Sequence, residues 1–443
     1  MLRTFRIGGI HPPENKIASS SKIEVLPLPE VAYIPIGQHI GAPATALVAK
    51  GDKVKVGQLV AKSSGFVSAN IHSSVSGTVS GIESIVDASG YPRPTIVVAV
   101  EGDEWEEGID RTETLKEQIT ATPQEIVKLV AEKGIVGMGG ATFPSHIKLM
   151  IPDGKVAEVL IINGVECEPY LTADDRLMVE RGEEIMVGIK LLMMSIGVEK
   201  AIVGIENNKQ QAIANLTALS KKYSGIAIQP LVVKYPQGGE KQLVKATINR
   251  EIPSGGLPID VGAVVQNVAT AFATYEAVQK GKPLIDRIVT VTGEGIAKPS
   301  NFMVRVGTPI SQLVEAAGGL PNGQLKVISG GPMMGKALPT ISSPVTKGTS
   351  GVLVMPSEMA TRPAASECIR CAKCVSACPM GLEPFLLNKL SVRKLYPELE
   401  SRKVTDCIEC GSCSYICPAG IPLLDYIRTG KSAVMHAIRT RKK

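Results

Sequence analysis

Residues 368–379 read CIRCAKCVSACP, and residues 407–418 read CIECGSCSYICP. Each stretch has the spacing C-x2-C-x2-C-x3-C-P, which binds cubane [4Fe–4S] clusters in bacterial two-cluster ferredoxins. Together they hold eight of the nine cysteines of this 443-residue chain. Because clusters of this kind mostly carry single electrons, the two stretches predict an electron carrier or a redox enzyme with a helical, ferredoxin-like domain.

The spacing also predicts which thiolates share a cluster. Three cysteines at two-residue intervals wrap one tight turn, and the fourth leads away from it and reaches the other cluster. We therefore expect one cluster on Cys368, Cys371, Cys374 and Cys417, and the other on Cys407, Cys410, Cys413 and Cys378. The alternatives are two zinc sites, which usually pair two C-x2-C knuckles over a longer gap, or a disulfide framework, which is typical of short secreted chains.

Composition and charge narrow the class of protein. Hydrophobic residues make up 44% and charged residues 20%, and the net charge of +6 is too small to indicate nucleic-acid binding. The sequence contains no charge-free apolar run of the ~18 residues expected of a membrane span, and its start, MLRTFRIGG, lacks a signal-peptide core. Reduced iron–sulfur cysteines also fit the cytosol.

Changes of pattern along the chain predict a multidomain protein with α/β and β parts. Residues 31–101 alternate short strands with glycine turns and resemble the barrel-sandwich hybrid of lipoyl and biotinyl domains, although no swinging lysine stands at the tip, Ala69–Ser73. The pattern further predicts an N-terminal extension (1–30), an α/β domain (115–283), a β-grasp domain (284–350), the helical cluster domain (360–430) and a basic tail (431–443). We expect the tail to be solvated, with an anionic lipid surface or an acidic partner as the alternative.

The α/β domain is expected to be Rossmann-like. Its first helix should run from Pro123 to Lys133, with Thr122 as the N-cap. Strands and helices then alternate, which argues for a parallel sheet covered by helices. The predicted elements are the strand 156–163, the helix 180–196, the strand 201–205, the helix 209–223 and the strand 231–234.

A glycine-rich loop and three other segments are the candidate cofactor site. The loop, GIVGMGGATFPSHIK at 134–148, allows backbone N–H groups to approach a phosphate or a flat ring, and Lys148 adds a positive charge. The other segments are NGVECEP at 163–169, YPQGGEKQL at 235–243 and VQNVAT at 265–270. Two of them follow predicted strands, where ligand crevices of open α/β sheets lie. Each segment alone could be a plain loop or cap.

In this order the segments resemble the NADH-binding flavoprotein subunit of respiratory complex I, with its G-R-G-G-A-G-F-P, N-x-D-E-G-E-P, Y-x-x-G-E-E and V-N-N-V-E-T motifs. Here Met138, Thr142, Val165, Cys167 and Gly239 depart from them. The resemblance implies NADH stacked near Phe143, with Glu168 and Glu240 as the catalytic residues near the nicotinamide or its ribose. It implies FMN bound by Gly137, Gly139, Gly140, Lys148, Asn163, Glu166, Tyr235, Gly238, Asn267 and Thr270.

The order of all motifs, with SGGPMMG at 329–335 and the two cubane runs, resembles the C subunit of Rnf-type electron transport complexes. This resemblance implies reversible transfer between NADH and FMN, then through two [4Fe–4S] clusters to iron–sulfur and membrane subunits of the same complex. Ferredoxin would be the indirect partner, and other subunits would couple the reaction to ion transport. The resemblance also implies a peripheral position on the cytoplasmic side of the cell membrane. Two alternatives remain: an iron–sulfur relay without flavin, or a subunit of a soluble flavin–cluster dehydrogenase.

Overall fold

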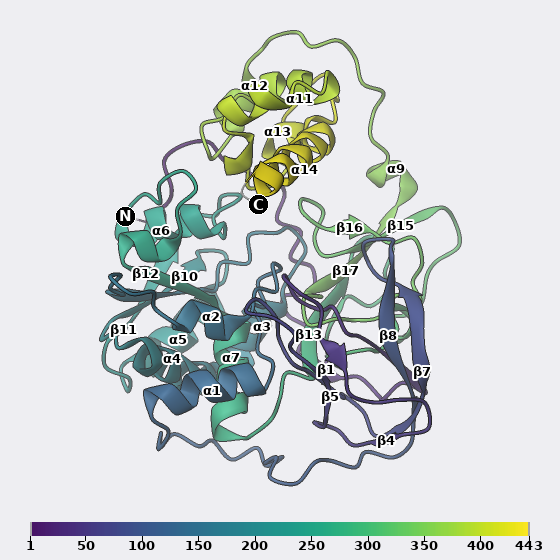
Figure 1. Ribbon diagram of the computed structural model, residues 1–443. Helices are drawn as coiled ribbons and strands as arrows, with labels where there is room; N and C mark the ends of the chain where they lie inside the picture. Colours follow the sequence, from purple (N-terminus) through teal and green to yellow (C-terminus); the bar gives the residue numbers. More distant parts are fainter. Residues whose placement is uncertain (1, 442–443) are drawn as a thin grey trace.

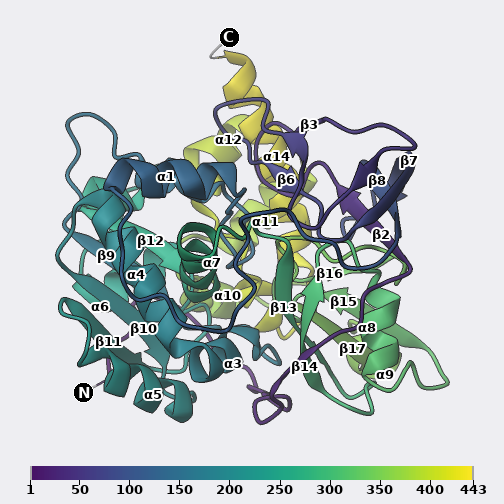
Figure 2. The ribbon, with the colours of Figure 1, turned by 90° about the horizontal axis from the view of Figure 1, so that it is seen from below.

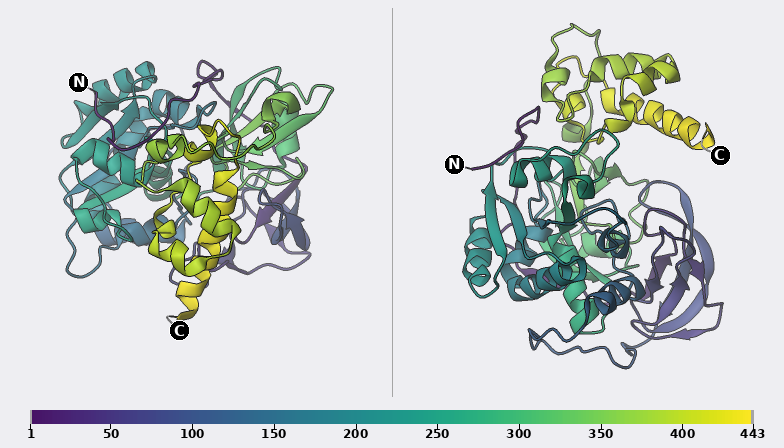
Figure 3. Two further views of the ribbon diagram at one scale, coloured as in Figure 1. Left: turned by 90° about the horizontal axis from the view of Figure 1, so that it is seen from above. Right: turned by 60° about the vertical axis from the view of Figure 1, so that its left-hand side comes forward.

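The computed structural model describes residues 2–441, which form four domains of different architecture (Figure 1). The α/β domain occupies the left of Figure 1, the two β-rich domains the right, and the helical cysteine-bearing domain the top. Seen from above, the helical domain lies across the other domains (Figure 3, left). No helix within residues 2–441 is long and apolar enough to cross a membrane.

The α/β domain contains a four-stranded parallel sheet in the order β11-β10-β9-β12. Its strands are β9 (Val159–Asn163), β10 (Ala201–Glu206), β11 (Ile226–Leu231) and β12 (Ala263–Asn267). Its helices are α1 (Pro123–Glu132), α2 (Ser145–Leu149), α3 (Ala173–Glu180), α4 (Gly182–Ile196), α5 (Gln210–Ser220), α6 (Glu240–Ile248), α7 (Val268–Gln279) and the 3-10 turn η1 (Pro258–Val261). Successive residues of β9 enter different apolar clusters, so the sheet is covered on both faces. Figure 2 shows α1, α4 and α7 together on one of these faces.

Three elements of this domain differ from the sequence prediction. The helix expected at 180–196 is α4, which begins at Gly182, but the helix α3 before it was not predicted; the carboxylate of Glu180 at the end of α3 binds Arg176 and the amide of Ile23. The strand expected at 231–234 is wrong: β11 ends at Leu231, because Val232 turns to donate its N–H to the carbonyl of Arg3. The strand β12 was not predicted. All three differences depend on partners distant in sequence.

The barrel-sandwich hybrid has two small antiparallel sheets, β2-β8-β7-β4 and β3-β5-β6. The strands are β2 (Val31–Pro35), β3 (Thr45–Ala46), β4 (Lys53–Val54), β5 (Leu59–Lys62), β6 (Ile71–His72), β7 (Gly77–Val86) and β8 (Pro92–Val100). Its tip packs against the neighbouring domains, as the Asn70 amide donates to the carbonyl of Glu132 (3.1 Å) and the Asn70 carbonyl accepts from Lys347 (2.8 Å). The tip is therefore a fixed contact between domains.

The third domain is a six-stranded mixed sheet in the order β1-β14-β13-β17-β15-β16. It contains β1 (Ile23–Val25), β13 (Asp286–Thr292), β14 (Ser300–Arg305), α8 (Ile310–Ala316), β15 (Leu325–Ser329), β16 (Lys336–Ala337), β17 (Gly351–Pro356) and then α9 (Ser357–Ala360). Strand β17 lies beyond residue 350, where the sequence placed the end of this domain. Strand β1 comes from the expected N-terminal extension, which is therefore part of the fold.

The helical domain consists of short helices around one longer helix. They are α10 (Lys373–Ala377), α11 (Pro384–Val392), α12 (Tyr396–Ser401), η2 (Val404–Asp406), α13 (Ser412–Tyr415) and α14 (Leu423–Arg441). Residues 431–441, expected to form a solvated tail, continue α14 instead, and Val434 is buried. Of that expected tail, Lys442 and Lys443 lie outside the described residues.

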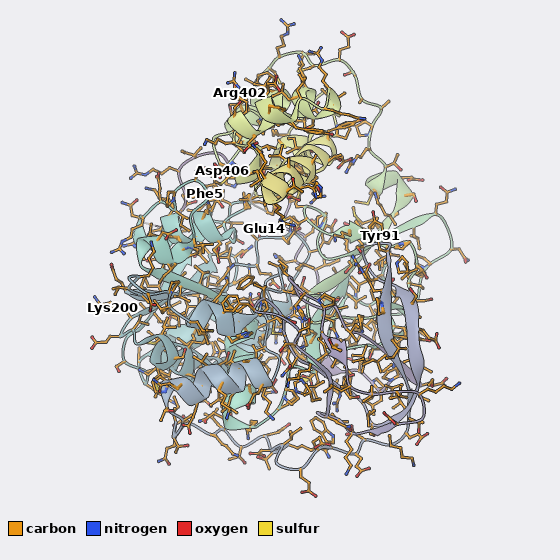
Figure 4. All side chains as sticks on the ribbon, in the orientation of Figure 1. Phe5, Glu14, Tyr91, Lys200, Arg402 and Asp406 are labelled. Carbon is orange, nitrogen blue, oxygen red and sulfur yellow. The ribbon has the colours of Figure 1, made fainter. Side chains whose placement is uncertain are left out.

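The N-terminal segment joins the helical domain to the α/β domain. The Gly9 N–H donates to the carbonyl of Ala377 (2.9 Å), and Ile10 pairs with Tyr235. Figure 4 labels Phe5 and Glu14 of this segment below the helical domain, in which Asp406 is labelled. The segment thus fixes the position of the cysteine-bearing helices over the sheet.

Candidate functional site

The candidate site lies where the direction of the parallel sheet reverses. From β9 the chain continues to β10 on one side, and it later returns to β12 on the other side of β9. Ligands of open α/β sheets bind at such a switch point, outside the carboxyl ends of the strands. The two strands end side by side at Asn163 and Asn267, and the Asn267 amide donates to the carbonyl of Asn163 (3.3 Å).

The glycine-rich loop lies beside this switch point, and we call the region between the loop and the strand ends the crevice. The N–H of Gly137 donates to the carbonyl of Phe143 (2.8 Å), and the N–H of Met138 donates to the hydroxyl of Thr270 (2.9 Å) on α7. These bonds leave Gly139 and Gly140 exposed. A side chain at Gly139 would point at Asn267, with its Cβ 3.6 Å from that residue's Cβ. The loop thus presents bare backbone beside the N-terminus of α7.

The opposite wall is formed by the segments after β9 and β11. The Asn163 amide donates to the carbonyl of Gly238 (2.9 Å), whose N–H donates to the sulfur of Cys167 (3.3 Å). Burial raises the pKa of Cys167 strongly, so the thiol stays protonated and acts as a packing group. At the rim, Lys148 forms an ion pair with Glu240 (2.8 Å), and both side chains are partly exposed. A charged pair therefore borders the crevice where solvent has access.

A buried network of charges lies beneath the crevice. The Glu166 carboxylate accepts from the N–H of Asp174 (2.8 Å) at the start of α3, and the Asp174 carboxylate accepts from Asn267 (2.7 Å). Burial and the nearby Glu166 raise the pKa of Asp174 to about 7. Burial lowers the pKa of the adjacent Arg287 guanidinium to about 10. Sequence reasoning missed Asp174 and Arg287, because neither stands in a motif.

Lys16 supports the same loop from the N-terminal segment. Its ammonium donates to the backbone carbonyls of Glu166 (2.8 Å), Glu168 (2.8 Å) and Leu171 (2.7 Å). Burial lowers its pKa to about 8. No signal in the sequence could have identified this residue, which lies about 150 positions from the loop that it holds.

Glu168 is partly buried and faces the SGGPMMG loop of the third domain. Its carboxylate accepts from the N–H groups of Met333 (3.1 Å) and Met334 (2.7 Å). Burial raises its pKa to about 7, and these two N–H donors oppose the rise. Glu240 differs, since it stands at the open rim as the first residue of α6. The two glutamates therefore have different environments.

The cysteines of the two runs lie in the helical domain, where several of them from different runs are close to one another. Burial and the neighbouring thiols of Cys410, Cys407 and Cys378 raise the pKa of Cys413 to about 12. Cys374 lies close to Cys417, and it also accepts from the N–H of Phe385. The structure thus brings the fourth cysteine of each run to the other run's loop. All nine cysteines are free, and no three metal-ligating side chains within residues 2–441 converge as on a single ion.

An apolar contact connects the crevice with one of these cysteine groups. Tyr235 is buried, and its hydroxyl donates to the backbone carbonyl of Cys410 (2.8 Å). Ile10 and Ala377 pack around this pair, with Met333 beside them. The segment that carries Gly238 is thereby joined directly to the loop that carries Cys410.

The residues present fit a flavin nucleotide and two cubane clusters. The crevice offers two exposed glycines, backbone N–H groups and the amides of Asn163 and Asn267 at a sheet switch point. In addition, the amide nitrogens of Gln237 and Gln266 are buried without a partner among the described atoms, which leaves donors unmatched. The eight thiols of the two runs are the donor set that two [4Fe–4S] clusters require.

Comparison with known proteins gives the same arrangement. Four family models match in chain order: an RnfC barrel sandwich hybrid domain at residues 4–103, a Nuo51 FMN-binding domain at 130–276, an SLBB domain at 288–337 and a 4Fe-4S dicluster domain at 362–418. The chain is 47% identical over 408 residues to the C subunit of a proton-translocating ferredoxin:NAD(+) oxidoreductase complex of Clostridium ljungdahlii, covering 90% of this chain and 86% of that protein. It is 44% identical over 438 residues to the C subunit of a Na(+)-translocating complex of Acetobacterium woodii, covering 98% and 97%.

The chain belongs to the RnfC family, the C subunits of ion-translocating ferredoxin:NAD(+) oxidoreductase complexes. The predicted family and the four kinds of domain are confirmed. The dicluster match decides against zinc sites, and membership of the RnfC family decides against a subunit of a soluble dehydrogenase. A solved NAD+-reducing [NiFe]-hydrogenase shares the fold with a TM-score of 0.52 at 19% identity, over 70% of this chain and 62% of that one.

Proposed function

We propose that this RnfC protein exchanges a hydride between NADH and FMN in the crevice and passes the electrons singly through its two clusters to a partner protein of the complex. NADH gives two electrons together, whereas a cubane cluster accepts one, and bound FMN supplies the conversion between the two. The observation that carries the proposal is the direct link, through Tyr235, between the crevice and the backbone of Cys410.

The proposed FMN site uses the residues that line both walls. The bare backbone of Gly137, Gly139 and Gly140 allows close approach, and Lys148 supplies a positive charge at the rim. Asn163, Gly238, Asn267 and Thr270 are already tied to one another or to the loop, so they hold a fixed shape. Glu166 holds the start of α3, and Tyr235 holds the cluster side. Pre-organised groups of this kind reduce the cost of ordering on binding.

We place NADH on the open side of the crevice, beside Phe143 and Glu240. Glu240 is partly exposed and already paired with Lys148, so it can orient a ribose or an amide through a shared hydrogen bond. Glu168 is partly buried and bonded to Met333 and Met334. It would act by fixing the third-domain loop beside the site, and no side chain needs to act as a general acid.

The order of the clusters follows from the same contact. Cys410 belongs to the group of Cys407, Cys413 and Cys378, and it lies against Tyr235. We propose that this group receives electrons first and that the group of Cys368, Cys371, Cys374 and Cys417 delivers them. The receiver would be an iron–sulfur or membrane subunit of the complex on the cytoplasmic side of the membrane, with ferredoxin as the indirect partner.

The test is anaerobic purification of the protein, followed by flavin analysis and NADH-dependent ferricyanide reduction. We expect bound FMN and ferricyanide activity in the wild type. Gly139→Val, whose side chain would project toward Asn267, should lose FMN and activity and keep its iron content. A wild type that contains both clusters and neither flavin nor activity would overturn the proposal in favour of a simple iron–sulfur relay.

A further inference from the structure

The two cysteine loops of the helical domain differ in their exposure. Every residue from Thr361 to Lys373 is exposed, including Cys368 and Cys371. In the other loop Cys410, Gly411, Ser412 and Cys413 are buried, and Met333 of the third domain packs against Gly411. One cluster site therefore faces the interior contact with the crevice, and the other faces the outside. We refer to residues 361–373 as the exit loop.

Resting on the electron path proposed above, we propose that the exit loop, with Tyr415 and Tyr426, is the docking surface of an iron–sulfur protein whose own cluster lies under an acidic surface. Such a partner would exchange electrons with the site of Cys368, Cys371, Cys374 and Cys417. An electron that reaches an exposed centre needs an acceptor seated on that face.

The surface around the exit loop carries large apolar and aromatic side chains that are exposed to solvent. Ile369 is 69% exposed, Tyr415 49% and Tyr426 45%. The segments that carry them are neighbours, because α10 packs against α13, the Ser366 N–H donates to the carbonyl of Ala419 (2.9 Å), and Arg362 of the exit loop pairs with Asp425 of α14. Exposed aromatic residues beside an aliphatic one are typical of the centre of protein interfaces.

The charge of this domain selects an acidic partner. From residue 360 onwards the chain has 14 Lys and Arg against 7 Asp and Glu, whereas the two signs almost balance before it. Arg370 and Lys373 stand between the cluster cysteines, and neither forms an ion pair within residues 2–441. Free positive charges at an exposed redox site steer an oppositely charged protein toward it.

Two other occupants fit these observations less well. A lipid surface would satisfy the positive charges, but it offers no redox centre to an electron leaving the cluster. A second copy of this chain would bring the same free Arg370 and Lys373, and like charges placed together disfavour association. An acidic iron–sulfur protein can cover the apolar side chains, neutralise the positive charges and accept the electron.

The first experiment maps the partner in the intact complex. A water-soluble carbodiimide joins a lysine directly to a carboxylate in contact with it, and mass spectrometry identifies the joined peptides. We expect Lys373 to be joined to an Asp or Glu of an iron–sulfur subunit. The proposal would be overturned if Lys373 were joined only to a second copy of this chain. It would also be overturned if the Lys373 side chain could be cross-linked only after detergent had removed lipid.

The second experiment compares two double variants with the same change of charge. Arg370→Glu with Lys373→Glu alters the exit loop. Arg393→Glu with Lys394→Glu is the control. Arg393 caps the C-terminal end of α11, whereas Cys374 lies at the other end of this helix, beside Phe385. Lys394 has the same positive φ as Arg370 (57°), so the backbone at the two substituted sites is comparable. Both variants should keep wild-type iron content and ferricyanide activity.

In the reassembled complex at low salt, the exit-loop variant should reduce the partner's clusters at least ~10-fold more slowly than the control, and added salt should diminish the difference. Equal rates would overturn the docking surface. An absence of NADH-dependent ferricyanide activity in the wild type would instead count against the proposed function, and the carbodiimide result would still decide the docking surface.

Discussion

Replacing Glu168 by glutamine should make the stability of the protein depend less on pH. The wild-type carboxyl is buried against the N–H groups of Met333 and Met334, and burial raises its pKa from 4.5 to about 7. Since one pKa unit corresponds to ~1.4 kcal/mol, keeping this carboxylate ionised costs the folded state ~3 kcal/mol above pH 7. The unfolded chain binds fewer protons than the native state between pH 4.5 and 7, so wild-type stability falls as the pH rises through this range.

Glutamine keeps the size of the side chain and one oxygen that can accept from Met334, but it does not titrate. Losing the acceptor for Met333 should lower stability by ~1 kcal/mol at every pH. The difference in unfolding free energy, variant minus wild type, should therefore rise by ~2 kcal/mol from pH 5.5 to pH 7 and then level off. Lys16 and Tyr235, which also act on Glu168, are present in both proteins.

The assay is urea unfolding at several pH values between 5.5 and 8.5, followed by circular dichroism and by cluster absorbance. Glu158→Gln is the control, because Glu158 lies in a surface ion pair with Arg250 and such pairs contribute ~0–1 kcal/mol. A difference curve for Glu168→Gln that stays flat, or that falls with rising pH, would refute the reasoning.

Four further substitutions test other parts of the site. Cys378→Ala should remove the cluster held by the Cys407–Cys413 loop, and Cys417→Ala should remove the cluster held by the Cys368–Cys374 loop. EPR distinguishes the two clusters. If each variant instead loses the cluster of the run in which its mutated cysteine lies, the fourth cysteines are not exchanged between the runs. Tyr235→Phe should slow reduction of both clusters by NADH, destabilise by ~1 kcal/mol and leave FMN content unchanged. Lys16→Met should lower the unfolding free energy by ~3 kcal/mol, because three carbonyls lose a charged donor; unchanged urea unfolding would contradict this.

Much of the site was predictable because its signals are local. The cubane spacing specifies a turn whose three thiols face one point, and β-α alternation specifies a parallel sheet with a ligand crevice at its carboxyl edge. The helix 123–133 was predicted from Thr122 and Pro123, and the structure has both bonds of the capping box there. The strand at 231–234 was mispredicted, because what ends β11 is the pairing of Val232 with Arg3.

The sequence by itself determined the kinds of domain, and it predicted the cluster ligands and the four segments of the proposed cofactor site, since each signal depends on neighbours within a few residues. Only the tertiary structure decided what surrounds them. Lys16 donates to the backbone carbonyls of the loop at 166–171, Met333 and Met334 donate to the Glu168 carboxylate, and Tyr235 donates to the carbonyl of Cys410. These contacts join residues about 150 to 175 positions apart, and no local spacing encodes such distances. The proposed order of the clusters and the exposure of the exit loop both depend on packing between domains, which only the folded chain defines.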